Sequence, residues 1–538
     1  MGSSESDRLI FQETDEAGNS TATYIYSGDG ASRRTSSGRV DVMTSPSSTS
    51  LWSTKPLVSS LSDVFLPSGY PHSVSDDYLP YQVFDSLQAF CSSIAGLLSS
   101  RAVLQGVGVG NADASPTSAL LLHILQDISG RIATILFAHR VGTALEPECK
   151  TYRLAADVFN DIAMIMDCLS PMVPAGMMRV TVLSTAGVLR ALCGVAGGSS
   201  KASLSAHFAR WGNLAELNAK DSSQETVISL FGMLVGSVVI SHINSFTTTW
   251  IALLLLLALH LSMNYAAVRT VQMTSLNRQR ANITFSALLD SDASLANKLS
   301  LNSMSASAVT SKLTIFTPAD VAYHERIFHR DGALRWTSHS STSTSTSTST
   351  EHLGSAQIGL ALSSFFGTST NGIKTTMPVN QLTSLFSKES YLLYLTPSSQ
   401  SQAPKRTWNA SILLKRNCSI IDQLKAWTHA LLAARILMQM DSSKQSQAEI
   451  ERGRSKERGR INRGRKDSSP GDAADLSGSG PTLDVLERTL SCLNAESRFE
   501  GVTHAPNPVQ RQGPKSQDEP HVLLQFLDLC LLVRRCEV

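Results

Sequence analysis

Residues Thr226 to Val268 read TVISLFGMLVGSVVISHINSFTTTWIALLLLLALHLSMNYAAV and contain no Asp, Glu, Lys or Arg. A helix needs about 20 apolar residues to cross a bilayer, so this stretch has the length for two passes. The polar patch from His242 to Thr249 is the expected turn between them. Gly232 and Gly236 stand four residues apart in the first pass, which should let a neighbouring helix approach closely.

A buried helical hairpin in a large soluble core is the alternative interpretation. The first apolar run, Val227 to Ile240, is shorter than a full membrane span. If the hairpin is in a membrane, the flanking charges set its orientation. Basic residues precede it and follow it, and its turn has none; they are Lys201, Arg210, Lys220, Arg269, Arg278 and Arg280. By the positive-inside rule, both ends of the hairpin should face the cytosol or matrix, and its turn should face the opposite side.

Composition narrows the function classes. The chain has 538 residues, a net charge of +2 and 17% charged residues. The balanced charge gives no reason to expect a nucleic-acid partner, and the low charged fraction fits a membrane or a deep core. Its eight cysteines form no CxxC pair, so they read as buried thiols of a reducing compartment. The first residues show no cleaved signal peptide, and the compartment cannot be assigned.

We predict a mainly α fold, in which a polytopic helical membrane bundle is followed by a small mixed α/β domain. The bundle should occupy residues 61–290 and the mixed domain residues 291–440. Residues 1–60 and the basic insert 441–481 lack apolar periodicity, so we expect them to be disordered. A Ser/Thr tract at 338–350 should be a flexible insert, and a helical segment should fill 482–538.

Within the bundle, apolar spacing and breaker residues predict further helices before the charge-free stretch. These are a helix from Tyr81 to the glycines at Gly106–Gly110, then Pro116–Gly142, Tyr152–Leu169, Val180–Gly194 and Ser203–Leu217. In the mixed domain we expect strands at Tyr391–Leu395 and Ser411–Leu414 and a helix at Ile420–Met440.

The helix at Tyr152–Leu169 carries the most informative charges. Arg153, Asp157 and Asp161 recur at intervals of four and therefore share one helix face, with Asn160 beside them. Carboxylates on an apolar helix are costly unless they are paired, protonated or bound to a cation. An internal Arg153–Asp157 ion pair is the expected arrangement, and a proton or cation site is the alternative. Arg131 and Arg190 are the candidate partners for the second carboxylate.

No motif identifies a catalytic site, a metal site or a cofactor. The run GVGVG at Gly106–Gly110 lacks the GxGxxG spacing and a following GK[ST], so a helix-ending turn is expected there. Neither HExxH nor GxSxG occurs in the sequence. The basic insert around Arg452 to Lys466 could touch RNA or anionic lipid, but interspersed glutamates favour a solvated linker.

Several long stretches resemble the root UVB sensitive family. They include GYPHSVSDDYLPYQVFDSLQAF, LQDISGRIATILFAHRVG, RLAADVFNDIAM, LCGVAGGSSKASLSAHFARWGNLAELNAKDSSQETV and HERIFHRDGALRW. The resemblance runs from about Phe65 to Met440. It implies a membrane-associated protein linked, in plants, to seedling development, root responses to UV-B and vitamin B6 status.

The shared motifs and the charge pattern together nominate a set of functional candidates. They are Asp127, Arg131, Arg153, Asp157, Asn160, Asp161, Arg190, His207, Asp221, Gln224 and Glu225. The first hypothesis is a membrane scaffold or regulator of small-molecule handling, without catalysis of its own, acting with a protein partner or a homologous family member. The second is a small-molecule or ion-coupled transporter, supported by six apolar helices, by charges within them and by an Asp-x-x-Gly-Arg at Asp127–Arg131. The third is an enzyme acting on a cofactor-like substrate.

Overall fold

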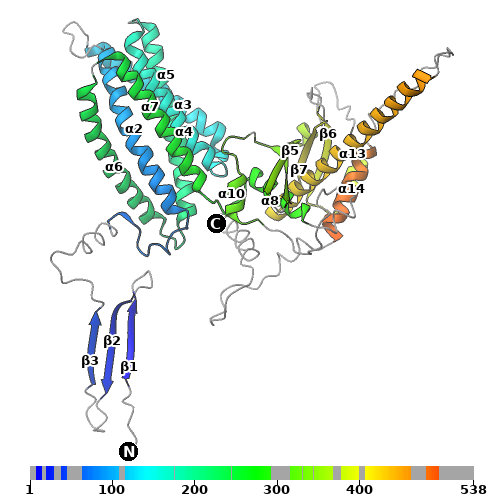
Figure 1. Ribbon diagram of the computed structural model, residues 1–538, viewed down its shortest axis with the longest axis horizontal. Helices are drawn as coiled ribbons and strands as arrows, with labels where there is room; N and C mark the ends of the chain where they lie inside the picture. Colours follow the sequence, from blue (N-terminus) through cyan, green and yellow to red (C-terminus); the bar gives the residue numbers. More distant parts are fainter. Residues whose placement is uncertain are drawn as a thin grey trace, which may run out of the picture. The chain divides into compact units, whose positions relative to one another are not determined.

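The structure is a computed structural model that describes residues 8–14, 20–28, 38–44, 64–107, 116–174, 176–243, 245–291, 316–329, 331–342, 345–366, 377–398, 406–461 and 480–495. The chain divides into two compact units, Met1–Met273 and Thr274–Val538. Each unit is taken by itself below. The first is a helical bundle preceded by a small sheet, and the second is a mixed α/β domain (Figure 1).

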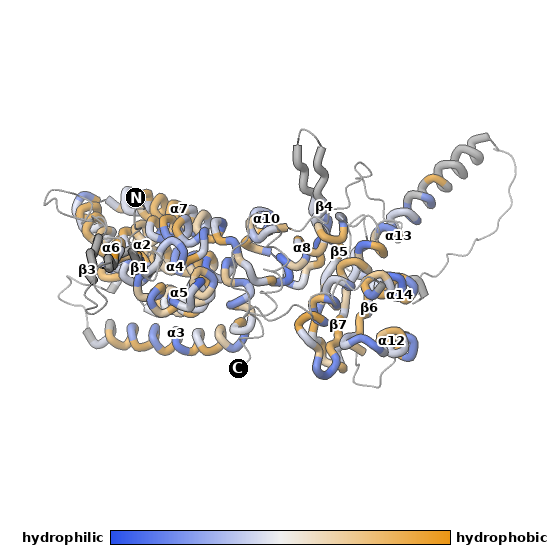
Figure 2. Tube along the Cα trace, turned by 90° about the horizontal axis from the view of Figure 1, so that it is seen from below, coloured by the Kyte–Doolittle hydropathy of each residue, from blue (hydrophilic) through white to orange (hydrophobic). Residues whose placement is uncertain are grey.

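The helical bundle confirms the predicted fold class. Six helices follow one another in the first unit: α2 (Tyr78–Val107), α3 (Pro116–Leu145), α4 (Cys149–Leu169), α5 (Met177–Phe208), α6 (Leu214–His242) and α7 (Phe246–Thr270). Among the described residues, five helices are long and apolar enough to span a membrane, namely all of these except α4. Hydrophobic residues recur along them in Figure 2. Pro171, in the short 3-10 helix Ser170–Met172, ends α4 where the sequence predicted.

Helices α6 and α7 form the predicted hairpin. The polar turn lies between His242 and Phe246, and Ser245 caps α7 by accepting a hydrogen bond from the Thr248 backbone N–H. The two glycines of α6 meet α2 at close range. A Cβ on Gly232 would lie 2.6 Å from the Cβ of Ser93, and one on Gly236 would lie 2.7 Å from Leu97. The close approach predicted for these glycines is therefore present, with α2 as the neighbour.

The glycine-rich segment before α6 differs from the prediction. Helix α5 continues through Gly194, Gly197 and Gly198, where we expected one helix to end and a second to begin. Packing against α4 compensates for the weak helix propensity of glycine, since a Cβ on Gly197 would already touch Ala156 at 3.6 Å. The next helix then begins at Leu214, so the first pass of the hairpin is longer than its apolar core suggested.

Three described segments within the first 60 residues also differ from the prediction of disorder, and the rest of that stretch lies outside the described residues. Strands β1 (Arg8–Thr14), β2 (Ser20–Gly28) and β3 (Gly38–Thr44) form an antiparallel sheet in that order. The strands contain short runs of aromatic and β-branched residues, such as Tyr24–Tyr26, which favour extended structure. These runs are too short to stand out from the surrounding Ser, Thr and Gly.

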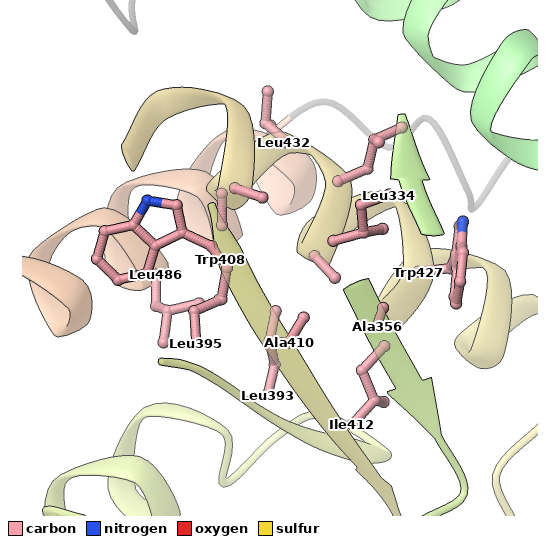
Figure 3. Packing of buried hydrophobic residues seen from close by; sticks show 14 of the residues in the cluster. Leu334, Ala356, Leu393, Leu395, Trp408, Ala410, Ile412, Trp427, Leu432 and Leu486 are labelled. Atoms are coloured by element: carbon pink, nitrogen blue, oxygen red, sulfur yellow. The ribbon is translucent and has the colours of Figure 1, made fainter. Parts of the chain in front are cut away.

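The second unit is built on a four-stranded mixed sheet in the order β4-β5-β7-β6. Its strands are β4 (Ala333–Thr342), β5 (Ser345–Ile358), β6 (Tyr391–Pro397) and β7 (Trp408–Leu414), and its helices are α8 (Arg278–Asp290), α10 (Pro318–His324), α11 (Leu362–Phe366), α12 (Val379–Leu385), α13 (Ile420–Ile461) and α14 (Gly480–Ala495). Side chains from the sheet meet Leu432 of α13 and Leu486 of α14 in one apolar core (Figure 3). The predicted strands at residues 391–395 and 411–414 and the helix from Ile420 are present.

Three expectations for this part of the chain need correction. The unit begins at Thr274 and not after residue 290, because α8 packs on β4, with Asn282 Nδ2 donating to the Ala333 carbonyl at 2.7 Å. The Ser/Thr tract at 338–350 pairs as an antiparallel hairpin, consistent with the β propensity of threonine. Helix α13 continues into the basic insert as far as Ile461, through residues with good helix propensity. The predicted C-terminal helical segment contains α14, and its remainder lies outside the described residues.

Candidate functional site

The charged face of α4 points into the helical bundle, as its spacing predicted. Arg153 Nη1 lies 3.2 Å from Asp157 Oδ2, which is the expected i, i+4 ion pair. Asp157 and Asp161 are 5% and 3% exposed. These side chains are buried because α4 packs between α5, α2 and α7, which leaves little of its surface for solvent or lipid.

Helix α2 supplies a second carboxylate to the same arginine. Arg153 Nη2 lies 2.7 Å from Asp85 Oδ1 and donates to Gln88 Oε1 at 3.1 Å. Arg153 Nε donates to the Tyr81 hydroxyl at 3.3 Å. One guanidinium thus uses its three nitrogens to hold two carboxylates, an amide and a phenol. A planar donor fork of this kind suits several oxygen acceptors at once.

Helix α7 brings two polar residues from the charge-free stretch to the α4 face. His260 Nδ1 lies 2.7 Å from Asp161 Oδ1, and His260 Nε2 lies 3.8 Å from Asp157 Oδ2. The Asn264 amide donates to Asp157. His260 and Asn264 are both completely buried. They share the inward face of α7 with Leu253 and Leu257, since all four recur at helical spacing.

The charges of this group do not balance. The buried acid cluster, defined as Asp85, Arg153, Asp157, Asp161 and His260, holds three carboxylates, one guanidinium and one imidazole. Even a protonated His260 would leave one carboxylate in excess. Burying an uncompensated carboxylate costs several kcal/mol, so the cluster favours uptake of a proton or a small cation.

A second polar group lies where α5 ends and α6 begins. Lys201 Nζ lies 2.8 Å from Asp221 Oδ2 and 2.7 Å from Glu225 Oε2. Gln82 Nε2 donates to Asp221 Oδ1 at 2.7 Å. Gln224 Nε2 donates to the Phe65 carbonyl at 2.5 Å, which ties α6 to the segment before α2. Three predicted candidates, Asp221, Gln224 and Glu225, therefore lie together at this end of the bundle.

The last candidate at this end, His207, holds Asp77 just before α2. His207 Nε2 lies 2.9 Å from Asp77 Oδ2, and the Gln272 backbone N–H donates to the same oxygen at 2.6 Å. Burial opposes ionisation of Asp77, but the hydrogen bond and charge of His207 and the Gln272 N–H outweigh it. Together they lower the pKa of Asp77 to about 2. The Asp77 carboxylate thus links the chain after α7 to the C-terminal turn of α5.

The opposite end of the bundle holds a separate ion pair. Arg190 of α5 pairs with Asp167 of α4, and the Ser99 hydroxyl of α2 donates to the same carboxylate at 2.9 Å. Arg190 is therefore not the partner of Asp161, as we had considered. Asp127 and Arg131 are exposed on α3, so Arg131 does not fill that role either. Asn160 is half-buried on α4 beside the charged face.

Sequence reasoning missed His260 and Asn264 as members of this site, and it named Asp85 only as a motif residue of the resemblance, without a role. His260 and Asn264 had a usable signal, because they stand four residues apart in the middle of the most apolar helix. A polar pair on one face of such a helix needs partners inside the bundle. Asp85, Gln88 and Tyr81 likewise recur on one face of α2. Within the described residues, no group of three or more His, Cys, Asp or Glu side chains is arranged to hold a metal ion.

Comparison with known proteins confirms the resemblance for the helical bundle, and its extension from residue 293 to about Met440 stays a prediction. A family model described as the vitamin B6 photo-protection and homoeostasis domain matches residues 52–292. RUS family member 1 of Dictyostelium discoideum is 44% identical over 239 residues, which are 44% of this chain and 45% of that protein. Protein root UVB sensitive 3 of Arabidopsis thaliana is 37% identical over 220 residues, which are 41% of this chain and 50% of that protein.

The match is confined to part of each protein. The chain spans about half the length of the curated relatives it matches. No solved structure matches the chain. The matched residues 52–292 contain the helical bundle, including every member of the buried acid cluster.

Proposed function

We propose, from the premise that this chain belongs to the root UVB sensitive family, that it is a helical membrane protein of vitamin B6 homoeostasis whose buried acid cluster governs the handling of a small molecule. The excess carboxylate of the cluster is the observation that carries the proposal. Ionisable residues inside a membrane bundle are costly, and they commonly mark proton relays and substrate or ion pathways.

In the first form of this proposal, the protein is a scaffold or regulator without catalysis of its own. It acts with a protein partner or with a homologous family member, and the acid cluster sets its conformation. A change in protonation of Asp161 would then alter how α4 and α7 pack, since His260 and Asp161 join these two helices.

The excess carboxylate also supports a second candidate function, which is transport of a small molecule coupled to a proton or cation. Coupling needs a buried group that changes its charge during the cycle, and Asp161 has that character. His260 Nδ1 lies 2.7 Å from Asp161 Oδ1, which places the imidazole to exchange a proton with the carboxylate. The two functions therefore share one site and differ in whether a molecule crosses the membrane.

Measuring vitamer pools in cells that lack the gene tests the shared proposal. Expression of the wild-type chain should restore the pools of B6 vitamers, and Asp161→Asn should fail to restore them at equal protein level. Asp76→Asn is the matched control, because the side chain of Asp76 is 91% exposed and outside the cluster. Unchanged vitamer pools in the deletion strain would contradict a role in vitamin B6 homoeostasis.

Uptake by purified protein separates the two candidate functions. Proteoliposomes that take up labelled pyridoxal saturably, and faster under a pH gradient, would select the transporter. An absence of uptake, together with a stable partner that co-purifies with the wild-type chain and not with Asp161→Asn, would select the scaffold or regulator.

A further inference from the structure

We propose that protons reach Asp161 from the end of the bundle at which Lys201 and Glu225 lie, and that an apolar seal stops them from passing to the other end. This inference rests on the proposed role of the buried acid cluster. It adds a direction of access and a barrier, neither of which follows from the cluster alone.

Unpartnered polar atoms in the cluster indicate that it accepts a proton. His260 Nδ1 and Asp161 Oδ1 are 2.7 Å apart, yet their alignment falls short of a hydrogen bond. Asp161 Oδ2 and Asn264 Oδ1 also lack a hydrogen-bond donor in the described structure. These three side chains are at most 3% exposed. A proton on Asp161 would remove its charge and supply the missing donor.

The groups around Asp161 come from every helix packed on this part of α4. Asp157 lies one turn away on α4 itself, and His260 approaches from α7. Asp85 on α2 is linked through Arg153, and Cys193 on α5 interacts electrostatically with Asp157 and Asp161. Asp157 and Asp85 are two carboxylates facing the two basic groups Arg153 and His260, so Asp161 is the carboxylate left over without a counter-ion of its own.

A continuous series of polar groups leads from the cluster to the Lys201 end. Arg153 contacts Asp85 and the Tyr81 hydroxyl. Tyr81, Gln82, Lys201 and Asp221 line a cavity of ≈ 10 Å³, which is about the space of one water molecule. Beyond the cavity, Lys201 pairs with Glu225, whose side chain is 52% exposed. A water in the cavity would complete a hydrogen-bonded route between the exposed glutamate and the buried cluster.

The bundle interior changes character on the other side of Asp161. One helical turn beyond Asp161 and His260 stand Met164 and Leu257, which pack with Leu98, Leu253 and their neighbours. This apolar seal comprises Ala95, Leu98, Ala102, Met164, Cys168, Leu253 and Leu257. Leu98 and Leu253 are completely buried. An apolar layer of this kind excludes water. It lies between Asp161 and the Arg190–Asp167 ion pair near the other end of the bundle, so we infer that it blocks a proton on Asp161 from reaching that pair.

Opening the seal should turn the bundle into a proton leak. Full-length protein carrying Leu257→Asn would be placed in proteoliposomes with a pH-sensitive dye inside, and a potassium diffusion gradient with valinomycin would drive proton entry. We expect the internal pH to change faster than with wild-type protein, because the amide admits water to the seal. Adding Asp161→Asn to Leu257→Asn should return the rate to that of the wild type.

Leu255→Asn is the matched control, because Leu255 lies on the same helix but is 63% exposed. It should cause no leak. A leak that persists in the Leu257→Asn/Asp161→Asn double variant would overturn the proposal, as would a folded Leu257→Asn protein that does not leak. A leak equally permeable to sodium would indicate an open pore and would also overturn it. None of these results depends on the vitamer measurements, so either proposal can fail alone.

Infrared spectroscopy of the wild-type protein gives a second test that needs no seal variant. As the pH is lowered, a carbonyl band typical of a buried carboxylic acid, separate from the bands of the exposed Asp and Glu side chains, should appear, and Asp161→Asn should abolish this band. In vesicles with oriented protein, the pH would be lowered either outside only, with a buffer that cannot cross the membrane, or on both sides, with a buffer that can. Comparing the band in the two cases would show from which side protons reach Asp161. A band that survives Asp161→Asn would assign the proton elsewhere.

Discussion

At the scale of single residues, Asp157 and Asp161 occupy different environments on one helix face. Asp157 contacts Arg153 and Asn264, so its charge is compensated by donors on two helices. Asp161 has His260 as its neighbour and no hydrogen bond. Two carboxylates four residues apart therefore differ in what their removal would do.

We expect Asp157→Asn to destabilise the protein and Asp161→Asn to leave it folded. Removing one member of a buried ion pair typically costs about 3–5 kcal/mol, because the partner charge remains buried. Arg153 would keep only Asp85 as its carboxylate in the first variant. The second variant removes a charge that has no full counter-ion. Thermal unfolding in detergent should show a lower Tm for Asp157→Asn alone, and equal Tm values for both variants would refute this distinction.

The pKa of Asp77 predicts an acid-sensitive contribution to stability. Its carboxylate has a folded-state pKa of about 2, below the ordinary value of 3.8. The ionised form therefore stabilises the fold above pH 3.8, and this contribution disappears as the pH falls through about 2. Asp77→Asn should lower the unfolding free energy at neutral pH by on the order of 1–2 kcal/mol, with a smaller difference at pH 3.

The neighbouring Asp76 provides the control for this measurement. Its side chain is 91% exposed, and its contact with Arg210 is 3.4 Å long. Exposed ion pairs contribute little, so Asp76→Asn should leave the unfolding free energy unchanged at both pH values. A pH-independent gap between wild type and Asp77→Asn would show that Asp77 acts by packing and not by charge.

The residue scale also shows the limit of reasoning from sequence. The Arg153–Asp157 pair could be predicted, because both members lie on one helix and helical spacing fixes their distance. The partner of Asp161 could not, because it depends on which helix packs against α4. Arg131 and Arg190 have the charge needed to pair with Asp161, but the fold places His260 beside this carboxylate. Local periodicity reveals which face is buried and not what lies opposite.

At the scale of elements, close packing of α6 on α2 depends on two glycines. A Cβ on Gly232 would lie 2.6 Å from the Cβ of Ser93, so Gly232→Ala must push the helices apart. In contrast, a Cβ on Gly198 in α5 would meet nothing within 4 Å. We therefore expect Gly232→Ala to lower Tm and Gly198→Ala to raise it. Gly198→Ala should raise the free energy of unfolding by about 0.5–1 kcal/mol, because alanine has a higher helix propensity than glycine.

Circular dichroism melting of the two glycine variants would measure this difference. If both variants lost stability equally, the short distance at Gly232 would have no energetic importance.

The glycines of α5, Gly198 among them, also explain why one helix boundary was predicted wrongly. A glycine-rich run predicted the end of a helix near Gly194, whereas tertiary packing carries α5 to Phe208. Propensity is a weak guide where neighbouring helices supply the stabilisation.

At the scale of the whole molecule, the alternating direction of six helices predicts a topology. If α4 crosses the proposed membrane with its five apolar neighbours, both ends of the bundle emerge on the same side. A tag inserted at Ile243, between α6 and α7, should then be protected in sealed vesicles that expose a tag at Thr274. Equal protease access to both tags would contradict the membrane hairpin. Retention in the pellet after carbonate washing is the accompanying expectation.

Most of the architecture could be predicted at this scale, because a charge-free stretch and proline or glycine boundaries define long helices. The small sheet β1–β3 could not, because its aromatic and β-branched runs are short and stand among Ser, Thr and Gly. The β4–β5 hairpin could not, because β5 begins in a Ser/Thr tract of a kind that also forms loops. Backbone pairing partners decide whether a Ser/Thr-rich segment is extended in a sheet. The boundary between the two units was misplaced because α8 is sequentially close to the bundle yet packs on β4.

The position of α4 has a consequence for biogenesis. With Arg153, Asp157, Asp161 and Asp167 on it, α4 is too polar to partition into lipid unaided. Its partners include His260 and Asn264 on α7, which is the last helix of the bundle to be synthesised. A nascent chain must therefore hold α4 at the insertion machinery until about residue 264 has been made. In ribosome-bound chains truncated before Phe246, α4 should remain protease-sensitive although its apolar neighbours are in the membrane, and chains extended past Asn264 should protect it.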